Sequence, residues 1–363
     1  MRDIINTWLH RYFGDEEALL LALIILIGLV LIWFLGDVLA PFLVAMVFAY
    51  ILQGLVTLLV SWKISRIWAV IITFTAFLGI IFSSSLFIVP LILAQVAAVV
   101  ADLPAILAGG EAILKKTVED YSGVISEATL EQAFAEVNQF ALSQGEALLT
   151  SSIGSLPSLL TLLIYGTLVF ILVFFLLKDW QMLTMSVKGF LPTRRGAMRL
   201  IWAEMDQQLA NYLRGKAIEI LIVAAVTYVV FLLFGLRYAL LLSVVVGLSV
   251  LIPFVGAFAV TIPVALVAVF QWGLGPQTFY LVAAYAIIQL LDGNLLVPIL
   301  FSEAVNLHPV FIILAVLVFG GVWGLWGVFF AIPLATFIKA VISAWPVSDA
   351  PIVADQESQN ESM

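Results

Sequence analysis

The chain has 363 residues, of which 64% are hydrophobic and only 10% are charged, and its mean hydropathy is +1.20. An average soluble domain is about half apolar and about a quarter charged, so this composition excludes a soluble globular protein and indicates an integral membrane protein. The formal net charge is −8, and the absence of cysteine excludes disulfides, thiolate metal sites and cysteine nucleophiles.

Apolar runs that are long enough to cross a bilayer, about 20 residues each, occur along the whole chain. The first four are Leu19 to Leu35, Val38 to Val60, Ile67 to Ala98 and Leu156 to Leu177. The nearly continuous apolar region that follows is divided into 217–234, 239–272, 277–300 and 309–342. The sequence therefore predicts an all-α polytopic membrane protein with about eight transmembrane helices.

Charges divide the polar segments into two kinds. Residues 178–216 and the short loop "SWKISR" are basic, whereas 102–155 is acidic. Basic loops stay on the cytoplasmic side of a bacterial inner membrane, so we expect both chain ends to be cytoplasmic. The predicted organisation is a cytoplasmic N-terminus (1–18), transmembrane spans 1 to 3 (19–98), an extracytoplasmic helical segment (99–155), span 4 (156–177), a cytoplasmic basic amphipathic segment (178–216), a C-terminal transmembrane domain (217–342) and a disordered cytoplasmic tail (343–363).

The extracytoplasmic segment carries one apolar stripe, formed by Leu130, Phe134, Val137 and Ala141. This spacing predicts an amphipathic helix, either as a lid on the membrane domain or as a domain that collects a substrate.

Glycine and proline interrupt the C-terminal apolar region in "VGLSVLIPFVGAFAVTIPVAL" and "FGGVWGLWGVFFAIPLATFIKA". Gly247 precedes Pro253 by six residues, and Gly327 precedes Pro333 by six. Transporters often carry paired broken helices in repeated halves, so broken or re-entrant segments are expected here. The matching spacing is either part of an internal repeat or a result of the frequent use of glycine and proline in membrane helices. Counting 239–272 as one crossing that is broken near Pro253 gives eight spans, whereas re-entrant hairpins near Pro253 or in 320–333 would preserve or alter that count.

Motifs for ATP-driven or enzymatic chemistry are missing. The pair Gly215-Lys216 is followed by Ala217, and Ala210 stands where the first glycine of a phosphate-binding loop would be. We therefore expect no ATP-driven pump, no enzyme, no cofactor and no metal site, with any driving energy supplied by an ion gradient.

Polar residues gather in "QLLDGNLL", within an otherwise apolar span. Gln289 and Asp292 are three residues apart and share one helical face, and Gly293 would let the backbone open beside Asn294. A charge at membrane depth is costly unless it is paired or hydrated, so this group is a candidate site for a solute or ion. Capping of a helix end is the alternative.

Three further residues are candidates for gating or proton coupling. Glu219 either forms an interfacial salt bridge with Lys216, three residues before it, or acts as a coupling acid. Glu303 and His308 lie in "SEAVNLHP", which is either a plain loop outside the hydrocarbon or a proton-linked gate. Arg237 and Lys339 are expected to be interfacial anchors.

The segments "NYLRGKAIEIL", "LSVLIPFVGAF" and the long run from "IIQLLDGNLL" to "ATFIKAV" resemble the permease family named for the autoinducer-2 exporter, and within it the PerM-type permeases. The resemblance covers about residues 10 to 346. It implies a multi-spanning inner-membrane transporter that forms a homo-oligomer, a pentamer being one form, with autoinducer-2 export or sodium/proton antiport as activities. Motif positions that become candidates for the transport pathway are Pro253, Gly256, Gly293, Asn294, Pro298, His308, Pro309, Gly321, Gly324, Gly327 and Pro333.

The leading hypothesis is a permease or exporter of a small solute, similar to autoinducer-2 or of another kind. The expected partners are the lipid bilayer, a small solute or ion and other copies of the chain, with no nucleic acid. A sodium/proton antiporter, a passive oligomeric channel and a membrane scaffold are the alternatives.

Overall fold

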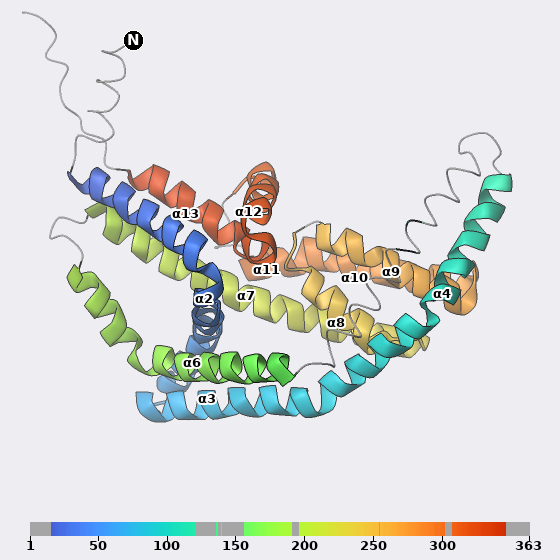
Figure 1. Cartoon of the computed structure of the whole chain (residues 1–363), viewed down its shortest axis with the longest axis horizontal. Coiled ribbons are helices and arrows are strands. Elements are labelled where there is room, and N and C mark those ends of the chain that lie inside the picture. The colour runs from blue at the N-terminus through green and yellow to red at the C-terminus, as the bar shows by residue number, and fades with distance from the viewer. Residues whose placement is uncertain are drawn as a thin grey trace, which may run out of the picture.

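The structure is a computed structural model that describes residues 16–120, 136, 139, 156–190, 196–253, 255–301 and 307–345. Within these ranges every regular element is helical, which confirms the all-α prediction. Figure 1 shows that long helices cross one another in two groups, one built on α2, α3 and α6 and the other on α7 to α10, with α7 reaching from one group to the other.

The first helix, α2 (Glu16–Ser61), runs through both of the first two predicted spans. The expected reversal between Leu35 and Val38 is therefore wrong. A reversal inside a membrane would leave backbone groups unpaired, and the two residues between the runs continue the helical hydrogen bonds instead. Pro41 is accommodated within the helix.

The next three elements follow one another without a break and form a long arm: α3 (Arg66–Ser83), the π-helical turn η1 (Ser84–Ile88) and α4 (Val89–Asp120). The arm extends the predicted third span into the predicted extracytoplasmic segment. The expected stripe from Leu130 to Ala141 lies outside the described residues.

Helix α6 (Leu156–Phe190) is kinked at Asp179 and packs on α2 and α3. The buried contacts among these three helices are apolar and include Val56, Val70, Phe77, Val173 and Leu177. The predicted fourth span is thus part of a longer helix.

Helix α7 (Gly196–Phe234) unites most of the predicted cytoplasmic segment with the predicted fifth span. No helix end occurs near residue 216, where that boundary was expected. As a result, basic residues that were predicted to lie outside the membrane belong to a helix that enters the protein interior.

Helices α8 (Ala239–Ser249) and α9 (Val255–Trp272) form a helical hairpin, here called the first hairpin. The side-chain oxygen of Gln271, at the end of α9, accepts a hydrogen bond of 2.7 Å from the Arg237 backbone N–H, just before α8. The two helices therefore run in opposite directions, so 239–272 forms a hairpin and not one broken crossing. With 11 residues, α8 is about 16 Å long, too short to cross a bilayer core of about 30 Å.

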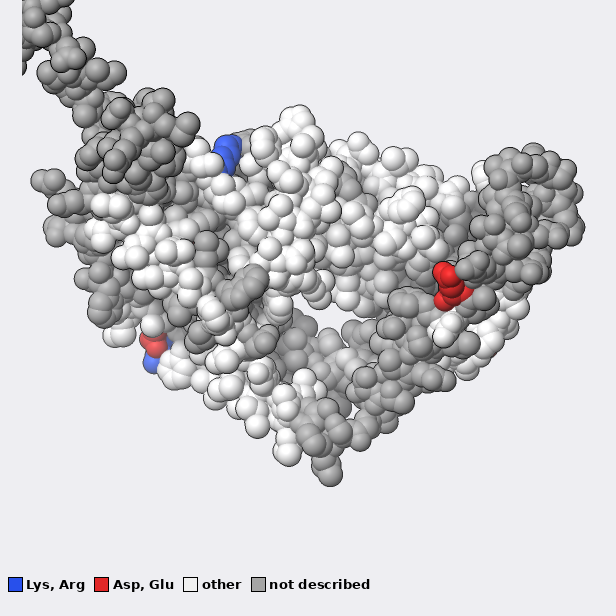
Figure 2. Space-filling view, turned by 45° about the horizontal axis from the view of Figure 1, so that its top comes forward, with Lys and Arg blue, Asp and Glu red and all other residues white. Residues whose placement is uncertain are grey.

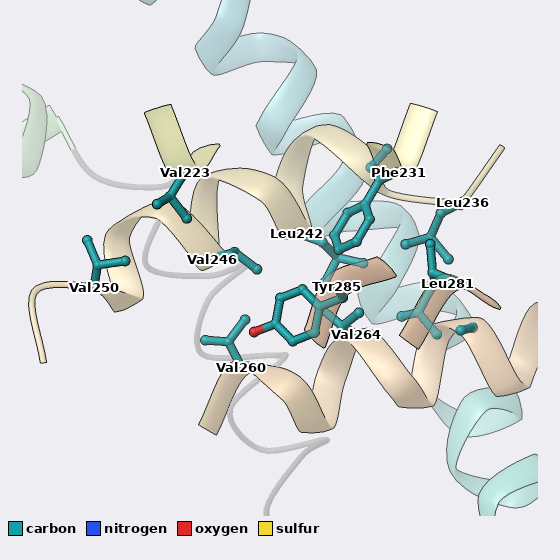
Figure 3. Close-up of a cluster of buried hydrophobic side chains, with 13 residues drawn as sticks. Val223, Phe231, Leu236, Leu242, Val246, Val250, Val260, Val264, Leu281 and Tyr285 are labelled. Atoms are coloured by element: carbon teal, nitrogen blue, oxygen red, sulfur yellow. The ribbon is translucent and has the colours of Figure 1, made fainter. Parts of the chain in front are cut away.

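The first hairpin is held by an apolar cluster that it shares with α7 and α10 (Figure 3). Val246 of α8, Val264 of α9, Phe231 of α7 and Tyr285 of α10 are all buried there. The chain is thus re-entrant in this region, as the glycine and proline pattern indicated.

The following helix is continuous from α10 (Pro276–Leu291) through the π-helical turn η2 (Asp292–Leu296) to α11 (Val297–Phe301). This matches the predicted span 277–300. The expected break at residues 292–294 is wrong, because the Val297 N–H still donates to the Asp292 carbonyl and the helix only widens. Such π-helical turns are often found at functional sites.

Helices α12 (Pro309–Phe329) and α13 (Ala331–Ala344) form the second hairpin. The chain reverses at Gly324, whose φ of 58° and ψ of −134° are not helical, and this brings Gly327 against the Phe319 carbonyl. The structure thus has a hairpin in this region and not a single span over 309–342. Glycine allows the reversal because other residues rarely adopt this backbone conformation.

Both hairpins have a glycine that touches a backbone carbonyl seven or eight residues earlier in the chain. A Cβ atom at Gly256 would overlap the Ser249 carbonyl, and one at Gly327 would overlap the Phe319 carbonyl. The matching positions in the two hairpins are thus Gly256 and Gly327, not the expected Gly247 and Gly327.

Seven helices within the described ranges are long and apolar enough to cross a membrane, and shorter apolar helices accompany them. Among the described residues on the face shown in Figure 2, charged side chains are few and lie far apart. The polytopic membrane class is confirmed, and seven long apolar helices with the shorter ones agree with the expected number of about eight.

We predict that Gly256→Ala lowers the apparent Tm of the purified protein, because the added methyl group meets backbone atoms that cannot move aside. Overpacking typically costs about 1–3 kcal/mol. Gly79→Ala is the matched control, since a Cβ atom there has no neighbour within 4 Å and alanine favours a helix by about 1 kcal/mol over glycine. Equal Tm values for the two variants would contradict the close contact.

Candidate functional site

The most strongly buried charges in the described part of the chain are Lys216 and Glu219 on α7. Their side chains are 8% and 2% exposed, and the Lys216 Nζ lies 2.8 Å from the Glu219 Oε2. The same ammonium donates a hydrogen bond of 2.8 Å to the Val250 carbonyl and lies 5.3 Å from the centre of the Phe301 ring. Lys216 therefore connects α7 to the first hairpin and to α11.

Local sequence explains how these groups approach so closely. Lys216 and Glu219 are three residues apart on one helix face, and Val250 lies at the C-terminal end of α8, where unpaired carbonyls attract a cation. Gly247 lets α8 pack against α7, because a Cβ atom there would lie 2.6 Å from the Ala224 Cβ. Gly215 likewise makes room for the Phe301 ring.

Asp292, at the π-helical turn, joins this polar cluster, and Gln289 lies three residues before it on the same helix. Asp292 interacts electrostatically with both Lys216 and Glu219. The Asp292 Oδ1 and the Gln289 Nε2 are buried, and neither makes a hydrogen bond within the described structure. One free acceptor and one free donor therefore lie three residues apart at the π-helical turn.

The polar cluster contains more carboxylates than ammonium groups. Two carboxylates, of Glu219 and Asp292, share one ammonium, that of Lys216. Glu219 has Lys216 as a direct partner, whereas no direct ionic partner of Asp292 occurs among the described residues. An unpaired charge at membrane depth costs several kcal/mol, so this arrangement favours binding of a further polar group, cation or proton.

The tips of both hairpins meet α7 one helical turn apart. The Tyr212 hydroxyl donates a hydrogen bond of 3.0 Å to the Phe329 carbonyl in the second hairpin, while Lys216 holds Val250 in the first. Pro253 and Gly256 belong to the tip that Val250 begins. A single face of α7 thus contacts both re-entrant elements.

Several predicted site residues lie apart from this cluster. The exposed Asn294 donates its side-chain N–H to the Leu290 carbonyl at 2.8 Å, one turn earlier in the same helix. Gly293 and Pro298 are exposed. His308 begins α12, and its Nδ1 accepts a hydrogen bond of 3.3 Å from the Val310 N–H. Glu303 lies outside the described residues.

Two residues in this region were missed as site residues. Lys216 was expected only as an interfacial partner of Glu219, and Tyr212 fell within the predicted amphipathic segment 178–216. The i, i+4, i+7 spacing of Tyr212, Lys216 and Glu219 could have placed all three on one face. Their burial depends on contacts made by Val250 and Phe329, which are distant in sequence.

Hydrogen bonds and an ion pair connect α7 and the turn that follows it to the helices α2 and α4. Tyr50 of α2 donates to the Asp206 Oδ1 at 2.8 Å on α7, and its carbonyl accepts from the Arg214 Nε at 3.2 Å. At the other end, Asp102 of α4 pairs with Arg237 at 3.6 Å and accepts a hydrogen bond from Tyr238. Burial, together with this hydrogen bond, raises the pKa of Tyr238.

The chain has several membrane spans, a buried ion pair that binds the tip of one helical hairpin, and a second hairpin tip one turn away along α7. This arrangement is typical of a transport protein. The model of the family described as "AI-2E family transporter" matches residues 21–347, and the chain belongs to this family. It is therefore a bacterial membrane protein of a transporter family, with the lipid bilayer and a transported solute as its partners.

Named relatives agree with this class. The chain is 45% identical to "Putative permease PerM" of Escherichia coli (strain K12) over 346 residues, which cover 95% of this chain and 98% of that protein. It is 28% identical to "Putative transport protein YueF" of Bacillus subtilis (strain 168) over 320 residues, or 85% and 84% of the two chains.

A double-mutant cycle on Lys216 and Glu219 tests whether the buried pair is coupled. We expect Lys216→Met and Glu219→Gln each to lower the free energy of unfolding by about 3–5 kcal/mol, because each leaves the other group buried and unpaired. The double variant should lose less than the sum of the two. Strictly additive losses, measured by reversible denaturation in detergent micelles, would refute the coupling.

Proposed function

We propose that the chain moves a small polar solute across the bacterial inner membrane through the cluster of Lys216, Glu219, Gln289 and Asp292. The observation that carries the proposal is the pair of buried, unpaired polar atoms, the Asp292 Oδ1 and the Gln289 Nε2, beside an ion pair that lies between two hairpins. A protein would not keep such atoms at membrane depth without a use for them.

The chemistry of the two free atoms favours a hydroxylated solute. A carboxylate oxygen accepts a hydrogen bond and an amide N–H donates one, and a hydroxyl group can do both. A solute similar to autoinducer-2 would fit, as would another small polyol. The family resemblance suggests that the solute is exported. The expected transport does not use ATP.

We propose that access to the cluster alternates through movements of the hairpin tips. Lys216 holds the first tip by the Val250 carbonyl, and Tyr212 holds the second by the Phe329 carbonyl. A solute that draws the ammonium of Lys216 toward itself would weaken its bond to Val250. The first hairpin could then open, which would couple solute binding to gating.

Sodium/proton antiport is the second candidate function, and the unmatched carboxylate of Asp292 favours it. A carboxylate without a direct ionic partner could carry a proton in one direction and a sodium ion in the other. Proteoliposomes that contain a pH-sensitive dye would report proton release when sodium is added. No response from neutral to mildly alkaline pH would exclude this function.

The layout of the chain in the membrane is also proposed. The start of α2, the start of α7 and the end of α13 meet in one cluster that includes Leu21, Met198, Ile201 and Ala340. This meeting supports a common side for the N-terminus, the basic segment 178–216 and the tail 343–363, and basic residues favour the cytoplasm. Residues 99–155 would then be extracytoplasmic, and a homo-oligomer such as a pentamer would form the working unit.

We predict that Asp292→Asn reduces solute flux about tenfold or more in reconstituted vesicles. Hydrogen bonds to a charged group are worth about 1.5–3 kcal/mol, and the amide weakens this acceptor. The solute is first identified by its ability to raise the apparent Tm of the purified protein. Asn294→Ala is the matched control, because Asn294 is exposed and bonds only its own helix. Unchanged flux in Asp292→Asn would exclude Asp292 from the site, and single-channel currents would indicate a channel.

A further inference from the structure

A cavity of about 460 Å³ lies between the two arms of the second hairpin. Its walls are almost entirely apolar and include Phe311, Leu314 and Val318 of α12, and Ile338 and Ile342 of α13. These five side chains are between 47% and 71% exposed. The cavity is therefore an open groove, not part of the packed interior.

Polar groups occur at one end of the groove only. His308, Lys339 and Ser343 line the end that is formed by the start of α12 and the end of α13, whereas Phe319 and Ala335 line the deep end. From Ala335 to Ser343 the helix rises about 12 Å. The groove therefore has the shape and polarity of a slot for a hydrocarbon chain with a basic entrance.

A water-soluble solute does not suit this groove. Polar solutes lose free energy in an apolar environment unless new hydrogen bonds form, and the deep walls offer only carbon atoms. The groove also shares no lining residue with the cluster of Lys216, Glu219, Gln289 and Asp292. Its ligand must be amphiphilic and separate from the transported solute.

The position of the entrance indicates which leaflet supplies the ligand. Ala340, on the same helix as Lys339, packs with Leu21, Met198 and Ile201 near the starts of α2 and α7. This is the side that the basic residues of 178–216 assign to the cytoplasm. Anionic phospholipids give the cytoplasmic leaflet its negative surface potential.

We propose that the second hairpin binds an anionic phospholipid of the inner leaflet, with one acyl chain in the groove and the phosphate near Lys339. The bound acyl chain covers the exposed apolar walls of the groove and contacts both arms of the second hairpin, which meet at Gly324. Lipid composition would thus influence the hairpin whose tip Tyr212 holds. The proposal stands independently of which solute is transported.

Native mass spectrometry of the delipidated full chain tests this site. Phosphatidylglycerol and phosphatidylcholine with identical acyl chains are added in equal amounts. We expect one tightly held lipid per chain, with about a fivefold preference for phosphatidylglycerol, the factor that corresponds to about 1 kcal/mol for one basic side chain near an anionic headgroup.

Two variants separate the roles of the headgroup and the acyl chain. Lys339→Gln should remove the preference for phosphatidylglycerol and keep the bound lipid, whereas Ala335→Phe should fill the groove and remove the lipid. Lys178→Gln, on α6, and Leu317→Phe, which is 67% exposed on α12 and does not line the groove, are the matched controls. Circular dichroism and gel filtration establish that each variant is folded.

Three results would overturn the proposal. Equal retention of both lipids, with no change in Lys339→Gln, would assign the binding to nonspecific annular lipid. A gain of one lipid per chain after deletion of residues 346–363 would show that the tail occupies the groove in the intact protein. Lipid binding that appears only when oligomers dissociate would assign the groove to a second copy of the chain.

Discussion

A lysine ammonium inside a membrane protein must find partners, because its desolvation costs several kcal/mol. Lys216 finds three: the Glu219 carboxylate, the Val250 carbonyl and the face of Phe301. Each partner comes from a different part of the C-terminal half or from another turn of α7. The need to satisfy one charge therefore fixes the position of the first hairpin and of α11 relative to α7.

Helix α7 has a corresponding role for the whole molecule. One of its ends packs with α2 and α13, its middle contacts both hairpin tips, and its far end leads into the turn that Asp102 of α4 holds. The contacts with α2 and α13 and the turn held by Asp102 lie at opposite ends of α7, which is 39 residues long. A displacement of α7 along its axis would therefore change its contacts with both hairpin tips and with α10 and α11.

Sequence patterns predicted what depends on local chemistry. Hydropathy found the long helices, glycine and proline indicated the re-entrant region near Pro253, and the spacing of Gln289 and Asp292 predicted that both share one face of a helix. Other predictions failed. The burial of Lys216 depends on Val250 and Phe301, which lie far away in sequence, and periodicity does not contain that information. The continuity of α2 through Gly36 and the reversal at Gly324 were missed because hydropathy marks apolar runs and not the places where a helix continues or turns back.

The π-helical turn at Asp292–Leu296 sets the rotational phase of the helix that contains it. In an uninterrupted α-helix, Asp292 and Phe301 would point about 180° apart, since each residue advances the direction by about 100°. The wider turn absorbs one residue and reduces that angle to about 80°. Both side chains can therefore face Lys216. If the same residues were wound as a regular α-helix without the wider turn, one of the two would point out toward lipid.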